Sequence, residues 1–432
     1  MATAVALTVG AAAPTASAVD VGSLDSPRHT AFYTPPADVA AAAERNGDLL
    51  RHEPMRVAAG LPGLPVPPVA ERIMYRSTGA AGTPVAVTGT LLQSPRPWTG
   101  RGTRPLAAVA PGTQGQGDLC APSRGFENLL SIQTAPPSLG AGYEILQAGV
   151  LLDAGFDVVV TDLEGLGTPG DHTYVDRASS AYSTLDAARA ALRIPGSRLA
   201  PDTPVVFSGY SQGGSAAAAA AEEAARYASE LNAVGAAASA PPADLVAVLD
   251  RIDGSLIVGA LAYTVNSLKV GNPEVGPEFD RLLNDRGREL LEVARHQCIA
   301  DSILTFGLRE TPAFLADGRR ASEVIRENPV IMAALDRQRI GRIAPSVPVR
   351  VQGNLHDDAV PYGQVEQLAR DWCDLGATVE FVTDPTPPIL PRSVINHLAP
   401  MPLHVLDVQR YLVDRVNGAP APNTCGVAPP PR

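Results

Sequence analysis

Lysine is nearly absent from this chain of 432 residues: Lys269 is the only one, and almost all 34 basic residues are arginines. The basic residues form no cluster, and acidic residues outnumber them to give a net charge of −11. Binding of nucleic acid or of an anionic membrane through charge requires a basic patch. The charge pattern therefore argues against both partners, while the preference for arginine over lysine carries no functional information.

Long apolar runs are also missing. Beyond the first residues, no stretch reaches the roughly 18 uninterrupted apolar residues of a membrane-spanning helix, so we expect no transmembrane segment. With 45% hydrophobic and 18% charged residues, the composition is typical of a globular protein that buries a full core. The length suffices for one large domain with an insertion, or for two domains.

The first 18 residues, MATAVALTVGAAAPTASA, are small and weakly apolar but lack the basic start of a secretion signal. They end in Ala16-Ser17-Ala18, the small-x-small pattern of a signal-peptidase site. We expect a leader over 1–18, a mature chain from about Val19, and secretion from the cell. A disordered, alanine-rich segment is the alternative.

Cysteine is scarce, and no Cys-x-x-Cys pair occurs, which disfavours a zinc site or a redox dithiol. We therefore expect no bound metal. An even number of cysteines behind a leader is typical of two structural disulfides, and spacing alone leaves three pairings open. The four residues are Cys120, Cys298, Cys373 and Cys425.

Short β-branched runs alternate with helical patterns over most of the chain. This alternation predicts an α/β fold with a mostly parallel sheet covered by helices on both faces. The predicted strands are 85–92, 106–110, 157–162, 205–209, 349–353 and 379–383. The predicted helices are 139–154, 180–194, 215–231, 362–375 and 402–416.

The alternation stops between about Pro241 and Pro348, where the pattern is helical only. The predicted helices of this region are 243–265, 277–294, 302–306 and 321–335. We expect a helical cap over 241–348, inserted at the carboxyl edge of the sheet, with a separate small domain as the alternative. The core would then comprise 19–240 and 349–432, the second part ending in a proline-rich tail.

The segment 205–215, VVFSGYSQGGS, resembles a nucleophile elbow. It places Ser211 in a tight turn between a short buried strand and an alanine-rich helix. Gly209 and Gly213, two residues either side, leave room for strand and helix to approach each other. Such a turn projects the hydroxyl at the carboxyl edge of the sheet, so Ser211 is the candidate nucleophile. A tight turn with an idle serine is the alternative.

A serine hydroxyl needs a base, normally a histidine oriented by a carboxylate, and in this fold both follow the serine in the chain. His397 lies after the last predicted strand and just before the final helix. Asp357 and Asp358 follow the strand 349–353, and spacing barely decides between them. The other candidates are His404, expected half-exposed in the final helix, His172 and His356, which flank the same edge, and the less well placed Asp301 and Asp384.

Acyl transfer also needs hydrogen-bond donors for the oxyanion. The backbone N–H after the nucleophile, that of Gln212, is one expected donor. Thr113 and Gln114, in the glycine-rich loop 111–118 after an early strand, would supply the second. A merely flexible glycine loop is the alternative. A further acidic turn, 162–167, closes another strand at this edge, and we expect it to be structural or to form a pocket wall.

Five segments together resemble the secretory lipase family. They are PGTQG (111–115), DLCAPS (118–123), DLEGLGTPGDH (162–172), GYSQGG (209–214) and DDAVPY (357–362). The resemblance spans Tyr33 to Gly426 and suggests a bacterial member of the family. It implies an α/β-hydrolase fold with a large helical cap that acts on lipid esters without a cofactor.

The resemblance also implies roles for single residues. The first acid of the Asp-x-x-Val-Pro segment, Asp357, would be the triad member, and the family's histidine segment matches 396–398, with Asn396 in place of an acid. The oxyanion position falls on Gln114, where a fungal member of the family has an acid. The family's cysteine pairing gives Cys120 with Cys298 and Cys373 with Cys425.

We therefore expect a secreted serine lipase or esterase that acts on triacylglycerol-type esters and contacts a lipid interface transiently. Ser211 would attack the ester carbonyl, His397 would take its proton, and Asp357 would hold the imidazole. Two enzymatic alternatives use the same residues: acyl transfer to an alcohol or cell-envelope acceptor, and short-chain ester hydrolysis. A catalytically silent hydrolase fold would require loss of a triad position, and none is lost.

Overall fold

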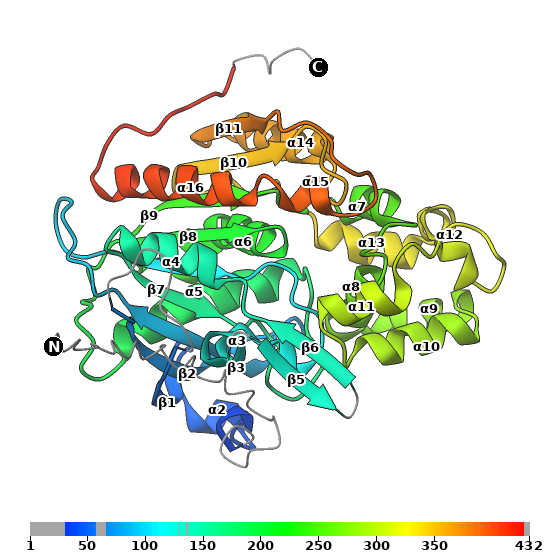
Figure 1. The fold of residues 1–432 in the computed structure, drawn as a ribbon, viewed down its shortest axis with the longest axis horizontal. Helices are drawn as coiled ribbons and strands as arrows, with labels where there is room; N and C mark the ends of the chain where they lie inside the picture. The colour runs from blue at the N-terminus through cyan, green and yellow to red at the C-terminus, as the bar shows by residue number, and fades with distance from the viewer. Residues whose placement is uncertain (1–30, 58–65, 129, 135–136, 427–432) are drawn as a thin grey trace, which may run out of the picture.

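Nine strands form a single sheet in the order β1-β2-β3-β7-β4-β8-β9-β10-β11. The computed structural model describes residues 31–57, 66–128, 130–134 and 137–426, so the predicted leader lies outside the described residues (Figure 1). β1 to β3 pair antiparallel with their neighbours, and the six strands from β7 to β11 in this order run parallel. The mostly parallel α/β sheet expected from the sequence is confirmed.

The strands have the following bounds: β1 Leu49–Met55, β2 Val69–Thr78, β3 Pro84–Gln93, β4 Leu106–Ala110, β7 Asp157–Thr161, β8 Val205–Tyr210, β9 Ala233–Ser239, β10 Val349–Asn354 and β11 Val379–Asp384. A separate two-stranded hairpin consists of β5 Leu130–Thr134 and β6 Pro137–Ala141. The helices flanking the sheet are α3 Pro122–Asn128, α4 Ile145–Asp153, α5 Arg177–Arg193, α6 Gln212–Tyr227, α14 Tyr362–Asp374, α15 Ile395–Leu398 and α16 Met401–Val416, with the short α2 Val39–Ala42 near the start.

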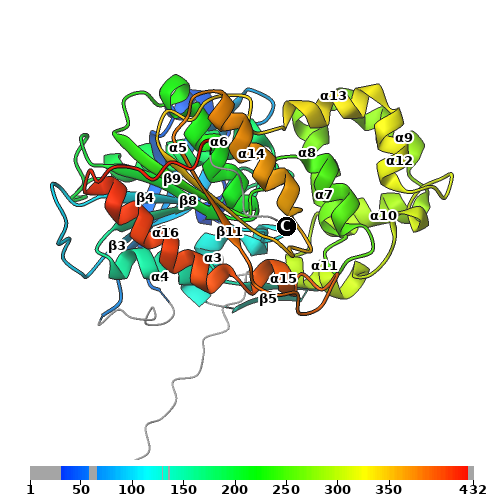
Figure 2. The same cartoon turned by 90° about the horizontal axis from the view of Figure 1, so that it is seen from above.

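Strand β8 shows how the sequence builds the layers. All six of its residues are buried, because helices cover both faces of the sheet. Val205 and Phe207 belong to the apolar cluster that includes α5 and α6, whereas Val206 belongs to the cluster that includes α4 and α16. Successive side chains of a strand point to opposite faces, so a continuous apolar run fits this position. Figure 2 shows the helices on either side of the sheet.

The six predicted strands are all present, but others were not anticipated. β1 and β2 extend the sheet with antiparallel strands. β9, with the sequence AVGAAAS, is rich in alanine, which has low strand propensity. Small residues are needed there because a Cβ at Gly235 would lie 2.5 Å from the Arg415 side chain.

The prediction of a helix over 139–154 is wrong at its start. Residues 139–141 belong to β6, and the helix begins only at Ile145. The backbones of two glycines cause this difference: a Cβ at Gly142 would lie 2.5 Å from the carbonyl oxygen of Gly125. The chain is therefore held extended against α3 until it has passed Gly142.

Between β9 and β10 the structure contains helices and no sheet strand. These are α7 Leu245–Ile252, α8 Ala260–Gly271, α9 Gly276–Leu282, α10 Asp285–Ala294, α11 Ile299–Phe306, α12 Ala321–Glu327 and α13 Pro329–Arg337, called the cap helices below. Three predicted helices are each broken into two, for example at Gly254, which has φ +72°, and before Pro329. Figure 1 shows the cap helices beyond the ends to which the arrows of the parallel strands point.

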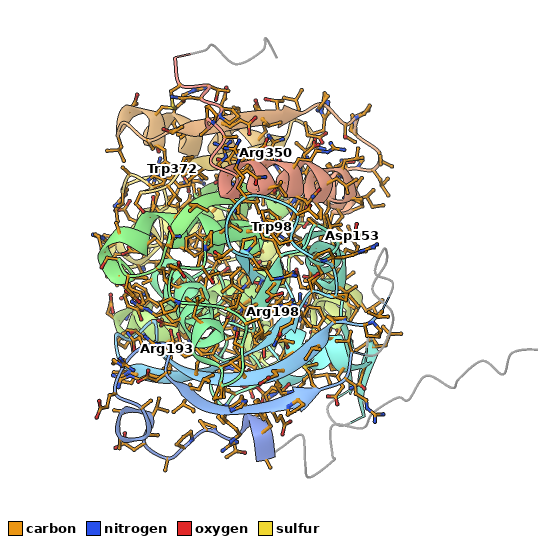
Figure 3. All side chains as sticks on the ribbon, turned by 90° about the vertical axis from the view of Figure 1, so that its left-hand side faces the viewer. Trp98, Asp153, Arg193, Arg198, Arg350 and Trp372 are labelled. Carbon is orange, nitrogen blue, oxygen red and sulfur yellow. A yellow bond between two sulfur atoms is a disulfide. The ribbon has the colours of Figure 1, made fainter. Side chains whose placement is uncertain are left out.

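Polar contacts lie at the opposite end of the molecule (Figure 3). Arg198 donates to Asp157 at the first position of β7, and Arg350 pairs with Glu380 across β10 and β11. The indole N–H of Trp372 donates to a buried glutamate carboxylate at 2.9 Å. Two of these contacts satisfy buried groups, the carboxylate of Asp157 and the indole N–H of Trp372.

Two disulfides join distant parts of the chain. Cys120, beyond β4, is bonded to Cys298 at the start of α11, and the two lie 178 residues apart in sequence. Cys373, in α14, is bonded to Cys425 near the C-terminus, over 52 residues. This pairing is the one implied by the family resemblance. The first bond ties a cap helix to the loop after β4, and the second fixes the C-terminal segment.

The two bonds should differ in their effect on activity. In the chain-entropy model, loops of these lengths contribute roughly 5 and roughly 4 kcal/mol to stability, so Cys120→Ser and Cys425→Ser should both lower Tm. Only Cys120→Ser should also lower ester hydrolysis at a temperature where both variants are folded, because its bond lies beside the loop 111–118. Calorimetry and ester turnover measure both effects. Equal loss of activity in the two variants would contradict this expectation.

Candidate active site

Ser211 lies in a strained turn between β8 and α6. Its backbone has φ 58° and ψ −121°, a conformation that side-chain-bearing residues rarely adopt. The flanking glycines make this turn possible: a Cβ at Gly209 would lie 2.1 Å from the carbonyl oxygen of Gly213, and a Cβ at Gly213 would lie 2.1 Å from that of Ala110. Strand and helix therefore meet without a side chain between them, as the nucleophile elbow requires.

His397 and Asp357 meet at the same edge of the sheet. His397 belongs to α15, Asp357 follows β10, and His397 Nδ1 lies 2.7 Å from Asp357 Oδ2. Both side chains are nearly inaccessible to solvent. Burial alone would lower the pKa of His397, but the carboxylate of Asp357, and to a lesser extent that of Asp358, outweigh this effect and the pKa is raised. Asp357 Oδ1 accepts the backbone N–H groups of Ala359 and Val360, which fixes the carboxylate.

Asp358 points away from its neighbour and holds the backbone of the histidine segment. Its Oδ2 accepts the N–H groups of Ser393 and Val394, at 3.1 and 2.9 Å, and its Oδ1 accepts that of His397 at 3.1 Å. Val394 has φ 66°, which is costly for a β-branched residue. The two adjacent acids thus have separate tasks: Asp357 orients the imidazole ring, and Asp358 stabilises the strained turn before it.

His404 is buried, and the expectation that it would be half-exposed is wrong. It lies in α16, and its Nε2 is 2.7 Å from Asp384 Oδ2 at the end of β11. Tyr210, the last residue of β8, lies between the two histidines: its ring centroid is 5.3 Å from that of His397 and 5.9 Å from that of His404. Its hydroxyl donates to the carbonyl of His397. Sequence spacing gave no sign of these contacts.

The candidate oxyanion donors lie on either side of this edge. Gln212 is the first residue of α6, where backbone N–H groups have no partner within the helix. Within the described part of the chain, the N–H groups of Thr113 and Gln114 also donate to no protein acceptor. The loop is nevertheless held firmly, because the carbonyl of Gln114 accepts the N–H of Ile299 and the hydroxyl of Thr113 bonds that of Tyr174.

The side chain of Gln212 is held by a buried histidine. Gln212 Nε2 lies 2.7 Å from His172 Nε2, and His172 Nδ1 lies 2.7 Å from the carbonyl oxygen of Glu164. Burial lowers the pKa of His172 to about 4, so the ring is neutral at neutral pH. Its Nδ1–H then donates to the carbonyl, and its Nε2 accepts from the amide. His172 therefore supports the residue that follows the nucleophile.

The remaining candidates have no part in these contacts. His356 is exposed. Asp301 accepts the N–H of Cys298 at the start of α11. Asp162 is fully buried and accepts the N–H and hydroxyl of Ser123, so the acidic turn after β7 is structural. Among residues 31–57, 66–128, 130–134 and 137–426, no group of three or more His, Cys, Asp or Glu side chains could hold a metal ion.

A parallel sheet between helices, a serine in a strained strand-to-helix turn, and a later Asp–His pair define an α/β hydrolase of the serine type. Comparison with known families places the chain more closely. Residues 133–424 match the family described as secretory lipase, and the chain belongs to the secretory lipase family. As a member of this family it is a carboxylic ester hydrolase that acts on lipid or other esters.

Three known proteins illustrate the similarity. A probable inactive lipase of Mycobacterium tuberculosis is 29% identical over 91% of this chain and 83% of its own length. A secreted triacylglycerol lipase of Malassezia globosa is 26% identical over 82% of this chain and 74% of its own. The closed state of Candida antarctica lipase A superposes with a TM-score of 0.75 at 21% identity, covering 94% of this chain and 89% of that one. The last comparison shows that the fold is shared.

The two neighbouring acids should differ in their effect on turnover. Asp357→Asn leaves the imidazole without its carboxylate and should lower kcat on the order of 10⁴-fold, the effect of removing the orienting carboxylate from such a triad. Asp358→Asn retains an oxygen acceptor for the backbone and should cost about tenfold or less. Steady-state hydrolysis of a soluble ester measures both, with Ser211→Ala as the inactive control. A larger loss in Asp358→Asn would contradict the assignment.

Proposed function

We propose that this protein is a secreted lipase that hydrolyses triacylglycerol-type esters through an acyl-enzyme on Ser211. The observation that carries the proposal is the contact of 2.7 Å between His397 and Asp357 at the sheet edge where Ser211 occupies its strained turn. The printed name of the Malassezia relative supports the substrate class. The secretory family and the two disulfides support secretion.

The proposed reaction has two halves. Ser211 Oγ attacks the ester carbonyl carbon while His397 Nε2 takes the hydroxyl proton, and the oxyanion accepts hydrogen bonds from the N–H of Gln212 and from the loop at Thr113 and Gln114. The imidazolium returns the proton to the leaving alkoxide, which departs as an alcohol. Water then repeats the sequence, which releases the fatty acid and restores the serine. The carboxylate of Asp357 stabilises the imidazolium in both halves.

We further propose that the segment 241–348 is a cap that receives the acyl chain. The cap helices surround an apolar cavity of about 110 Å³. Cavities of this kind, up to about 150 Å³, stay dry and take up small apolar groups. Tyr174 links the cavity to the site, because it lines the cavity and its hydroxyl is 2.9 Å from the hydroxyl of Thr113. An acyl chain entering here would leave its carbonyl near the oxyanion donors.

Narrowing this cavity should shift the preference for chain length. Ala262, on α8, lines the cavity, so a larger side chain there should exclude long acyl chains. The measured quantity is kcat/KM for a dodecanoate ester divided by kcat/KM for an acetate ester. Ala262→Val should lower this ratio, and Ala262→Phe should lower it further. Each excluded methylene forfeits about 0.8 kcal/mol, roughly fourfold. Hydrolysis rates for a series of p-nitrophenyl esters measure the ratio. A wild-type profile that falls from acetate upward would instead indicate a short-chain esterase.

Contact with a lipid interface is proposed for the face made by α4, α15 and α16, which lie together in Figures 1 and 2. Five apolar side chains on it are 40% to 63% exposed, an unusual concentration for a soluble surface. We call this set the leucine face: Leu146, Ile395, Leu398, Leu403 and Leu406. α15 also carries His397, so a lipid surface docked here would present its esters beside the site. With a net charge of −11, the protein would suit an uncharged or zwitterionic surface better than an anionic one.

Binding to lipid should depend on the leucine face. The double variant Leu403→Glu with Leu406→Glu should bind phosphatidylcholine vesicles on the order of 100-fold more weakly, because each buried leucine contributes about 1.5 kcal/mol or more. Vesicle flotation measures the binding. Leu375→Glu is the matched control: Leu375 is 47% exposed but follows α14 at the amino end of β11. Equal loss in the control would indicate a general charge effect.

A catalytically silent hydrolase fold is the second candidate, because the Mycobacterium relative is named a probable inactive lipase. The present chain retains the serine, the histidine and the acid, and both the contact of His397 with Asp357 and the strained turn at Ser211 favour activity. Labelling with a fluorophosphonate that reacts only with activated serines separates the two candidates. An active enzyme is labelled and Ser211→Ala is not, whereas a silent fold stays unlabelled in both.

A further inference from the structure

Two consecutive residues, Tyr143 and Glu144, form hydrogen bonds to the candidate oxyanion loop, residues 111–118. The hydroxyl of Tyr143 donates to the carbonyl of Thr113 at 2.6 Å. Glu144 Oε1 accepts the backbone N–H of Gly112 at 2.7 Å and the side-chain amide of Gln114 at 3.3 Å. Three hydrogen bonds from the segment before α4 therefore reach three consecutive residues of the loop.

Glu144 occupies the position immediately before the first residue of α4, where short polar side chains such as Ser, Thr, Asp and Asn commonly cap the free backbone N–H groups. Its carboxyl group caps none of them. The side chain extends instead to Gly112 and Gln114, which lie 32 and 30 residues earlier in the chain. The printed hydrogen bonds of this carboxyl group therefore go to the loop and none to the helix that follows it.

The surroundings of Glu144 favour an uncharged carboxyl group. The residue is 2% exposed, no ion pair reaches it within the described residues, and its Oε2 is buried without a hydrogen-bond partner there. A buried carboxylate without a cation is costly, and burial raises the pKa of Glu144 to about 7. The titratable groups facing it are phenols, Tyr143 directly and Tyr174 through Tyr143, and both have pKa values raised above 10.

We propose that Glu144 is a positioning residue for the oxyanion hole, which it assembles as an uncharged acid bonded to Gly112 and Gln114. The inference rests on the proposed role of the loop in ester hydrolysis. Gln114 and Gln212 then have matching supports: each oxyanion residue has its side-chain amide held by a buried, neutral titratable group, Glu144 on one side and His172 on the other. When Glu144 ionises, the new buried charge displaces the loop and turnover falls.

Three variants test the proposal with a soluble ester, so that lipid binding does not enter. Glu144→Ala should lower kcat about 10-fold to 100-fold with KM changed less than about threefold, because misplaced donors act on the transition state rather than on substrate binding. Glu144→Gln keeps an oxygen acceptor for Gly112 and cannot ionise, so at pH 6 it should retain kcat within about threefold. Gln147→Ala is the matched control: it removes a buried amide one turn along α4 that bonds Ser208 instead of the loop, and kcat should be kept.

The pH profile provides the reading that a purely structural role would not produce. Wild-type kcat should rise as His397 loses its proton and fall again above about pH 7 as Glu144 ionises, whereas Glu144→Gln should show only the rise.

The free energy of unfolding should also depend on Glu144. The pKa of Glu144 is raised from 4.5 to about 7 in the folded protein, so the stability that the group contributes is complete below pH 4.5 and is lost as the pH rises to about 7. Glu144→Gln should therefore gain in Tm relative to the wild type over this range.

Each outcome decides the matter. Full kcat in Glu144→Ala, or an alkaline decline that persists in Glu144→Gln, overturns the proposal while leaving the ester hydrolase intact, provided that Ser211→Ala is inactive. Activity in Ser211→Ala would instead refute the proposed function itself. Where Glu144→Ala does not fold, as melting curves would show, the profile of Glu144→Gln decides alone.

Discussion

Close contact between β8 and α6 is the constraint on which the site depends. Gly209, Gly213 and Ala110 approach so closely that no Cβ fits at either glycine, and the strained angles of Ser211 are the consequence. The turn costs on the order of 1–3 kcal/mol, which the fully buried strands β4, β7 and β8 offset by their packing between two helical layers. The proposed nucleophile therefore follows a fully buried strand in the middle of the sheet.

Burial disfavours the charged form of each buried titratable group of the site, and a neighbouring carboxylate decides which group is charged nonetheless. His397 is buried beside a carboxylate, so its charged form is favoured, which suits a base that must become an imidazolium during the reaction. His172 and Glu144 are buried without a countercharge, so burial favours the neutral form of both, lowering the pKa of His172 to about 4 and raising that of Glu144 to about 7. When the side chains that support the oxyanion loop are neutral, no nearby negative charge opposes the oxyanion. The backbone N–H donors can then stabilise the negative charge that develops in the reaction.

Features of the site that local sequence patterns encode could be predicted from the sequence. The turn at Ser211 follows from its glycines, and His397 follows from chain order. Only the family resemblance distinguished Asp357 from Asp358, because the side chains of adjacent acids differ in direction and their spacing from His397 is nearly the same. The burial of His404 depends on a partner twenty residues away. Glu144 carried no pattern at all, since a single acid between a glycine turn and a helix is indistinguishable from an ordinary helix cap.

The bond between Cys120 and Cys298 also orders events in time. The loop after β4 is synthesised long before the cap helix that holds it, and Asp357 and His397 emerge from the ribosome later still. During synthesis the serine turn can form while its base, its acid and the anchor of its oxyanion loop are all missing. A chain cut short before Asp357 and His397 thus has the proposed nucleophile but neither the proposed base nor the acid that orients it.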